Sequence, residues 1–210
     1  MSTHPGTPKP VSHLKTLAVP GLVALLAALL LWRAPAEQTL GSGIKIVYLH
    51  VALIWVGMAG IALSGLLGLA TAVFPRPRLA AWLHAASWTA FAFYAAGAVV
   101  SLAAEIVNWG AIFWQEPRTA AILQVLAVAV IVQVTHGWPL DARLKGTLHA
   151  ALAGFMLWAT TRAGLVLHPD NPIGSSSSAA IRFAFFGLFG LFAVAAGWLT
   201  WLLQRRSAAK

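Results

Sequence analysis

The sequence contains no cysteine, and this absence excludes several kinds of chemistry at once. Without a thiol the chain can form no disulfide, no covalent thioether link to a cofactor, no thiolate nucleophile and no cysteine-ligated metal site. Any metal would have to be held by histidine, methionine or carboxylate.

Charged residues are also scarce, at 9% of the 210 residues, whereas hydrophobic residues make up 60% and the mean hydropathy is +0.80. This composition excludes a soluble globular domain and is typical of an integral membrane protein. A span needs about 20 apolar residues, so six helices would use about 120 to 140 residues and leave only short connections. Any functional site is therefore expected inside a helical bundle or in its loops.

Six apolar stretches follow one another, separated by Pro, Gly, Ser or charged residues. They cover about 14–32, 46–74, 80–107, 119–138, 146–167 and 181–204. We therefore predict an all-α, six-helix transmembrane bundle over 14–204, between a disordered cytoplasmic tail at 1–13 and a basic cytoplasmic tail at 205–210.

Lysine and arginine, counted in alternate loops, indicate the orientation of this bundle. Nine fall on the side of both termini: Lys9, Lys15, Arg76, Arg78, Arg143, Lys145, Arg205, Arg206 and Lys210. Five fall on the other side: Arg33, Lys45, Arg118, Arg162 and Arg182. Both termini are therefore predicted to be cytoplasmic, and the net charge of +9 is largely a signal of topology that requires no nucleic-acid partner.

His50 lies near the start of the second span, about 6 Å below its outer end at about 1.5 Å per residue. Gly57, Ser64 and Gly68 share its helical face and would let another helix or a flat ligand approach closely. Two interpretations fit this position: a histidine bonded to a neighbouring carbonyl at a packed helix end, or a ligand-binding histidine.

The connection at 105–118 is rich in aromatic residues beside acids and an arginine. Its candidate site residues are Trp109, Gly110, Phe113, Trp114, Glu116 and Arg118. Such a shelf could stack against a flat apolar ligand while Arg118 pairs with the ligand's carboxylates. The alternative is an ordinary aromatic belt that anchors a helix at the interface, with Glu116 and Arg118 paired to each other.

His168 follows the fifth span, on the same predicted face as His50 and the aromatic shelf. Two imidazoles commonly form the axial pair of a haem iron, and an aromatic shelf suits the faces of a porphyrin. A solvated loop residue is the alternative for His168.

A second group, His84, His136 and His149, is predicted near the cytoplasmic ends of spans three to five. These side chains could ligate an inner haem b, or they could be interface residues. Glu105, near the end of span three, could be a proton-relay carboxylate or simply an acid that reaches water.

Two segments carry a resemblance to a known family. Tyr48-Leu49-His50-Val51, followed by Ile54-Trp55, resembles the start of the second span in the haem-handling cytochrome c assembly family, of the six-span haem exporter protein C (CcmC) type. The segment 109–118 resembles its tryptophan-rich loop, but Phe113 and Gln115 stand where tryptophans are usual and Glu116 replaces an aspartate. The resemblance covers roughly residues 14–204.

This resemblance implies a haem-binding and haem-delivery subunit of cytochrome c maturation in the bacterial cytoplasmic (inner) membrane. His50 and His168 would be the axial ligands of a b-type haem held transiently and without a covalent bond. The platform would comprise Trp109, Gly110, Phe113, Trp114, Glu116 and Arg118. Since Gln115 offers no aromatic face, this platform is expected to be weaker or differently registered.

The expected partners are a periplasmic haem chaperone, the lipid bilayer, and the ABC-type ATPase and membrane subunits of a maturation complex. ATP use is expected in a partner because the chain has no Walker A sequence. No porphyrin bond needs to change, so the protein is not expected to be an enzyme. The alternatives are a membrane haem b electron carrier that uses the inner histidines, and a small-solute transporter or scaffold.

The chain has ten tryptophans, of which only Trp109 and Trp114 are given a functional role. The others are interpreted as interface anchors or packing residues: Trp32, Trp55, Trp82, Trp88, Trp138, Trp158, Trp198 and Trp201.

Overall fold

The computed structural model describes residues 13–164, 173 and 176–208 and is all-α, as predicted. The six α-helices are α1 (His13–Arg33), α2 (Ile44–Val73), α3 (Pro77–Trp109), α4 (Pro117–Val134), α5 (Ala142–Arg162) and α6 (Ala179–Ala208). A short 3-10 helix, η1 (Thr135–Gly137), follows α4. The helix α6 continues to Ala208, through most of the segment predicted as a basic tail. Apart from His13, the predicted N-terminal tail lies outside the described residues.

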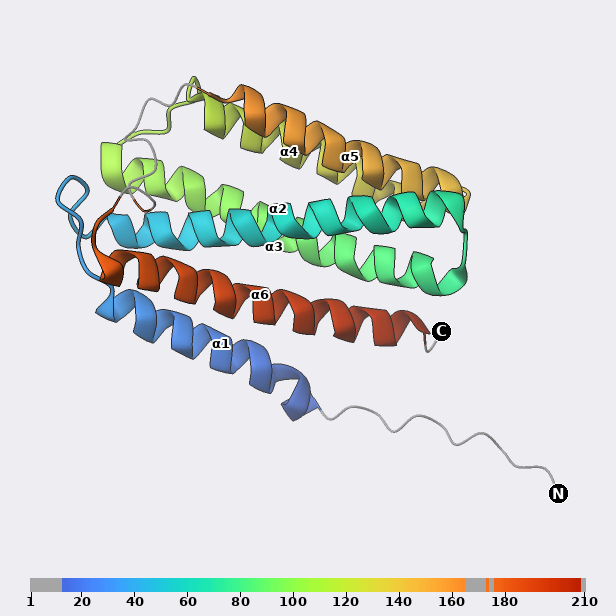
Figure 1. The fold of residues 1–210 in the computed structure, drawn as a ribbon, viewed down its shortest axis with the longest axis horizontal. Coiled ribbons are helices and arrows are strands. Elements are labelled where there is room, and N and C mark those ends of the chain that lie inside the picture. Colours follow the sequence, from blue (N-terminus) through green and yellow to red (C-terminus); the bar gives the residue numbers. More distant parts are fainter. Residues whose placement is uncertain (1–12, 165–172, 174–175, 209–210) are drawn as a thin grey trace.

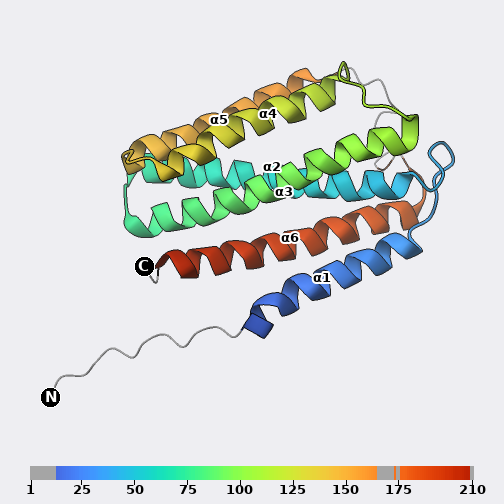
Figure 2. The same ribbon diagram turned by 180° about the vertical axis from the view of Figure 1, so that it is seen from behind.

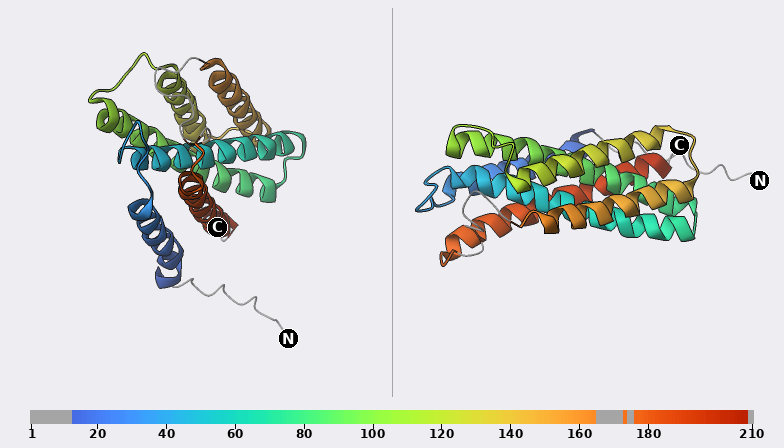
Figure 3. Two further views of the ribbon diagram at one scale, coloured as in Figure 1. Left: turned by 60° about the vertical axis from the view of Figure 1, so that its left-hand side comes forward. Right: turned by 90° about the horizontal axis from the view of Figure 1, so that it is seen from above.

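The helices are stacked in layers (Figure 1). The middle layer is α2 and α3, with α4 and α5 on one side and α6, then α1, on the other; the view from behind shows the same order (Figure 2). Successive helices run in opposite directions, lengthwise beside one another (Figure 3). The bundle therefore has a Trp109 end, where α3 finishes, and an opposite His136 end, where α1 begins and α6 finishes.

Local sequence signals set several helix ends. Pro77 and Pro117 occupy the first helical positions of α3 and α4, where the missing N–H costs nothing. Gly110 ends α3 with a left-handed φ of 78°, and its N–H donates to the carbonyl of Ile106 at 2.9 Å. The carboxylate of Asp141 accepts from the N–H of Arg143 at the start of α5.

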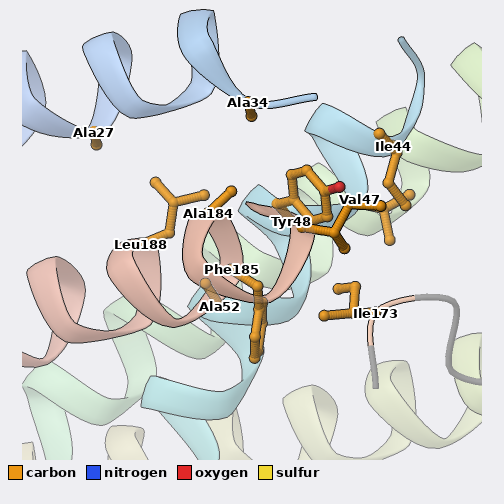
Figure 4. Packing of buried hydrophobic residues seen from close by; sticks show 11 residues of the cluster. Ala27, Ala34, Ile44, Val47, Tyr48, Ala52, Ile173, Ala184, Phe185 and Leu188 are labelled. Atoms are coloured by element: carbon orange, nitrogen blue, oxygen red, sulfur yellow. The ribbon is translucent and has the colours of Figure 1, made fainter. Parts of the chain in front are cut away.

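One apolar cluster joins α1, α2 and α6 near the Trp109 end (Figure 4). Tyr48 and Leu188 in this cluster are 0% exposed, and Phe185 is 2% exposed. The tyrosine that precedes His50 by two residues is thus part of the helix packing. Because Tyr48 and His50 are two positions apart on one helix, their side chains face different neighbours.

The helix α2 approaches α3 and α5 closely at glycines. A Cβ on Gly57 would lie 2.6 Å from the backbone nitrogen of Tyr94 in α3. Gly68 lies directly against the carbonyl of Gly146 in α5. The predicted close approach at Gly57 and Gly68 is therefore confirmed, and it is neighbouring helices that use it.

Four of the described helices are long and apolar enough to cross a membrane, two fewer than the six spans predicted. They are α2, α3, α4 with η1, and α6. The helix α1 contributes a shorter apolar stretch, Ala18–Arg33, and α5 begins with Arg143 and Lys145, which lower its hydropathy. Large apolar side chains point outward on the bundle, including Leu66, Val99 and Phe183, each more than 60% exposed at 66%, 67% and 72%. The chain is thus built as a multi-pass membrane protein.

We expect Gly146→Val to lower the unfolding free energy by about 1 to 3 kcal/mol, since a Cβ there would lie 2.5 Å from the carbonyl oxygen of Gly68. The measurement is reversible unfolding in detergent micelles. Gly154→Val is the matched control on the same helix, because a Cβ at Gly154 meets nothing within 4 Å. Equal loss of stability in both variants would contradict the role of this contact.

Candidate functional site

A cavity of about 560 Å³ lies among α2, α3, α4 and α5 at the Trp109 end. Its volume falls within the range of about 300 to 1,000 Å³ that is usual for small-molecule pockets. Much of the wall is apolar, formed by residues such as Val51, Ile54 and Ile122. The side chains of His50, Trp109 and Arg118, which the sequence placed in one site, all line this cavity.

His50 makes the bond to a neighbouring carbonyl that one interpretation of the sequence described, and it also lines the cavity. Its Nδ1 lies 3.3 Å from the carbonyl oxygen of Ile46, one turn earlier, and must donate there because a carbonyl only accepts. The neutral ring then has its lone pair on Nε2. Metal-ligating histidines usually donate their other N–H to a carbonyl or carboxylate in this way, which fixes the ligating nitrogen. The bond to Ile46 is therefore compatible with a ligand role at Nε2.

Trp109 is the last residue of α3 and is 37% exposed. Its ring meets that of Phe113 edge to face, with the ring centroids 6.5 Å apart and the planes at 82°. This is a favourable geometry for an aromatic pair. Phe113 thus packs against an indole on the cavity wall, although Phe113 itself is 43% exposed and does not line the cavity.

The other predicted platform residues have separate positions. Gly110 terminates α3. Glu116 precedes the first residue of α4, is buried, and its backbone carbonyl accepts from the N–H of Ala120. Trp114 is 64% exposed and lies outside the cavity wall. The segment predicted as one platform therefore divides into a cavity-facing part, Trp109 and Arg118, and an outward-facing part around Trp114.

Glu105 was expected to reach water or relay protons, and the expectation of a water-exposed acid is wrong. This side chain is 6% exposed and lines the cavity. Its Oε2 accepts from the N–H of Phe113 at 2.7 Å, and its Oε1 accepts from the hydroxyl of Thr119. One carboxyl group thereby joins the end of α3, the aromatic loop and the start of α4.

A sequence signal for this arrangement was present in α3. Ser101, Glu105 and Trp109 are spaced four residues apart, which places them on one helical face, and all three line the cavity. Trp55, assigned to packing from the sequence, also lines the cavity while its ring meets Phe185 at a centroid distance of 5.2 Å.

His168, the second predicted ligand, lies outside the described residues. The described residues nearest to it that line the cavity are Ala163 and Ile173, five positions before it and five after it.

The inner histidines lie together at the His136 end. Nδ1 of His84 is 3.2 Å from Nδ1 of His136, and Nε2 of His136 is 3.2 Å from Nε2 of His149. The cavity that borders His149 has a volume of about 10 Å³, far too small for a porphyrin. Because the rings contact one another directly, their arrangement does not fit an inner haem b. The described residues contain no group of three or more His, Cys, Asp or Glu side chains arranged to hold a metal ion.

No model of a known protein family matches this chain, and no curated protein matches it in sequence.

Glu105→Ala removes the acceptor for the Phe113 N–H and the Thr119 hydroxyl. We expect faster amide hydrogen exchange over 110–119 and a loss of about 1 to 3 kcal/mol in stability, the cost of leaving buried donors unpaired. Mass spectrometry of peptides from the exchanged protein measures this. Glu37→Ala is the control, because the Glu37 carboxylate accepts from the N–H groups of Thr39 and Leu40 in a separate, exposed turn. Unchanged exchange over 110–119 in the Glu105 variant would rule out this attachment.

Proposed function

We propose that the protein is a haem-binding and haem-delivery membrane subunit of cytochrome c maturation. The observation that carries the proposal is the convergence of His50, Trp109 and Arg118 on one largely apolar cavity at one end of the bundle. An imidazole can ligate the iron of a haem, an indole can stack on the porphyrin face, and a guanidinium can pair with its carboxylate side chains. The resemblance of the segments around His50 and Trp109 to the CcmC type points to the same function.

Each cavity residue has a defined task in this proposal. His50 offers Nε2 as an axial ligand while its Nδ1–H bond to Ile46 holds the ring in place. Trp109 covers an apolar face, and Arg118 pairs with a propionate. Haem supplies an iron with two axial positions, and its delivery requires exchange of an axial ligand without any change to the porphyrin. No catalytic residue is assigned.

His168 is proposed as the second axial ligand. The chain lines the cavity at Ala163 and lines it again at Ile173, and His168 is midway between them in sequence. Two histidines on different segments would allow one to be exchanged for a ligand from the acceptor while the other still holds the iron.

The proposed topology has six spans and both termini in the cytoplasm of a bacterium, with the Trp109 end facing the periplasm. The antiparallel packing of α1 beside α6 and of α5 beside α4 supports including α1 and α5 among the spans. The excess of lysine and arginine at the opposite end supports the orientation. The membrane is then the inner membrane.

The outward-facing aromatic residues are proposed as the contact with a periplasmic haem chaperone. Phe113 and Trp114 are exposed at the same end as the cavity, beside Trp109. An acceptor docked there would be next to the cavity opening. An ABC-type ATPase and further membrane subunits would complete the maturation complex.

A small-solute transporter is the second candidate, because a cavity of about 560 Å³ among four helices would also suit a small amphipathic solute. A haem b electron carrier based on His84, His136 and His149 has little support, since the rings contact one another and leave no room for a porphyrin.

Protein expressed with ample haem and purified in detergent is expected to show a haem absorbance spectrum. We expect His50→Ala to weaken haem binding by at least about tenfold. Loss of a residue that merely supports a metal ligand already lowers metal affinity by about tenfold or more, and this substitution removes the ligand itself. His136→Ala, at the other end of the bundle, is the control and is expected to retain haem. Haem lost only in the His136 variant would overturn the proposal, and haem-free wild-type protein would favour the transporter.

Trp109→Ala is expected to weaken haem binding by roughly 1 to 3 kcal/mol, because it removes an aromatic face from the cavity wall. Trp114→Ala should leave haem affinity nearly unchanged and instead slow haem transfer to the chaperone. Haem titration and a transfer assay separate the two effects. Trp138→Ala, an exposed tryptophan at the His136 end, is the control for general loss of interface anchoring. Equal affinities in the Trp109 and Trp138 variants would exclude the indole from the site.

A further inference from the structure

His84, His136 and His149 form a continuous row of rings that the proposed haem function does not use. The row joins α3, η1 and α5 at the His136 end. His84 and His136 are half-buried, whereas His149 is 1% exposed. The row thus leads from the end of the bundle to a fully buried imidazole.

The hydrogen-bond partners assign a proton position to each neutral ring. Nδ1 of His149 lies 2.9 Å from the carbonyl oxygen of Lys145 and must donate to it. Nε2 of His149 is then an acceptor, so its neighbour, Nε2 of His136, must carry a proton. Nδ1 of His136 is in turn an acceptor, and Nδ1 of His84 donates to it.

Ser87 gives the same assignment independently. Its hydroxyl donates to the carbonyl oxygen of His84 at 3.0 Å. Its oxygen also lies 3.2 Å from Nε2 of His136, and since the hydroxyl proton is already committed, that nitrogen must be the donor. Two separate sets of contacts therefore agree that His136 carries its proton on Nε2.

We propose that His84, His136 and His149 form a proton relay between water at the His136 end and the buried ring of His149. In the described part of the chain, Nε2 of His84 is the one nitrogen of the three rings without a hydrogen bond, so protons enter there. Nε2 of His84 takes a proton from hydronium, which leaves water. The Nδ1–H of His84 then passes to Nδ1 of His136, and the Nε2–H of His136 passes to Nε2 of His149.

After these transfers His84 and His136 are neutral again, and His149 carries both N–H bonds and the positive charge. The charge stops there because the carbonyl of Lys145 accepts a hydrogen bond but does not take the proton. Return follows the same steps in reverse. The charged side chain of Lys145 contacts the relay, where its Nζ donates to the carbonyl oxygen of His136 at 3.1 Å. Its positive charge disfavours charge on the rings and so favours return of the proton to water.

A small space lined in part by polar side chains lies beside His149. A cavity of about 10 Å³ adjoins the ring and is also lined by Ser64 and Gln133. The hydroxyl oxygen of Ser64 and the amide oxygen of Gln133 are buried and have no hydrogen-bond partner among the described residues. A space of this size holds about one water molecule, which these two oxygens would bind. The relay is independent of whether the cavity at the Trp109 end binds haem.

Nitrogen-15 NMR of histidine-labelled, full-length protein in lipid nanodiscs tests the proton positions directly. At neutral pH we expect His84 and His149 to carry the proton on Nδ1 and His136 to carry it on Nε2. A neutral His136 protonated on Nδ1, or a neutral His149 protonated on Nε2, would overturn the relay. This measurement uses the wild-type protein and so does not depend on a variant that folds.

His84→Phe tests the entry point. We expect exchange of the His136 Nε2–H with water to slow by about tenfold or more. In the relay, His136 releases this proton only after its own Nδ1 has received one from His84, and phenylalanine at position 84 cannot supply it. Thr147→Ala is the control, since the exposed Thr147 hydroxyl donates to the carbonyl of Arg143 and contacts none of the three rings, so the exchange rate should stay unchanged. An unchanged rate in His84→Phe, or equal slowing in Thr147→Ala, would refute transfer through the imidazole row.

Discussion

The close approach of α2 to both α3 and α5 is the constraint on which the rest of the structure depends. Bare backbone at Gly57 allows contact with α3, and Gly68 against Gly146 allows contact with α5. In lipid, helices gain little from the hydrophobic effect when they associate, so close van der Waals packing has to stabilise the bundle. The spacing of these three helices then fixes both the cavity at one end and the histidine row at the other.

An apolar cluster separates these two polar regions. Ile61, Val125 and Met156, from α2, α4 and α5, are each at most 3% exposed and lie in the same buried cluster. Ile54 and Tyr94 of this cluster line the cavity at the Trp109 end, whereas Ile61 lines the small cavity beside His149. The polar side chains of the cavity and of the histidine row are thus grouped near the two ends, with the apolar cluster between them.

Several of the buried polar groups have partners supplied by the backbone or by a neighbouring helix. The Glu105 carboxyl group shows this most clearly, because its two oxygens bind the aromatic loop and the start of α4. His50 and His149 each donate to a carbonyl one turn earlier on their own helix. A carbonyl oxygen has two lone pairs, so it can accept from the histidine ring as well as from the helical N–H. The ring is therefore oriented by its own helix, and no residue from another helix is needed.

The sequence by itself determined the helical class, the membrane character and the approximate helix limits, because apolar runs broken by Pro77, Pro117 and Gly110 are local signals. It also placed His50, Trp109 and Arg118 at one end, since alternating helices fix which loops meet. Only the tertiary structure decided which side chains face inward: Trp114 points outward, Glu105 is buried, and the three inner histidines contact one another. These outcomes depend on how each helix is rotated about its axis and on contacts between segments distant in sequence. When a helix is apolar on all sides, the spacing of its apolar residues does not indicate which face points inward.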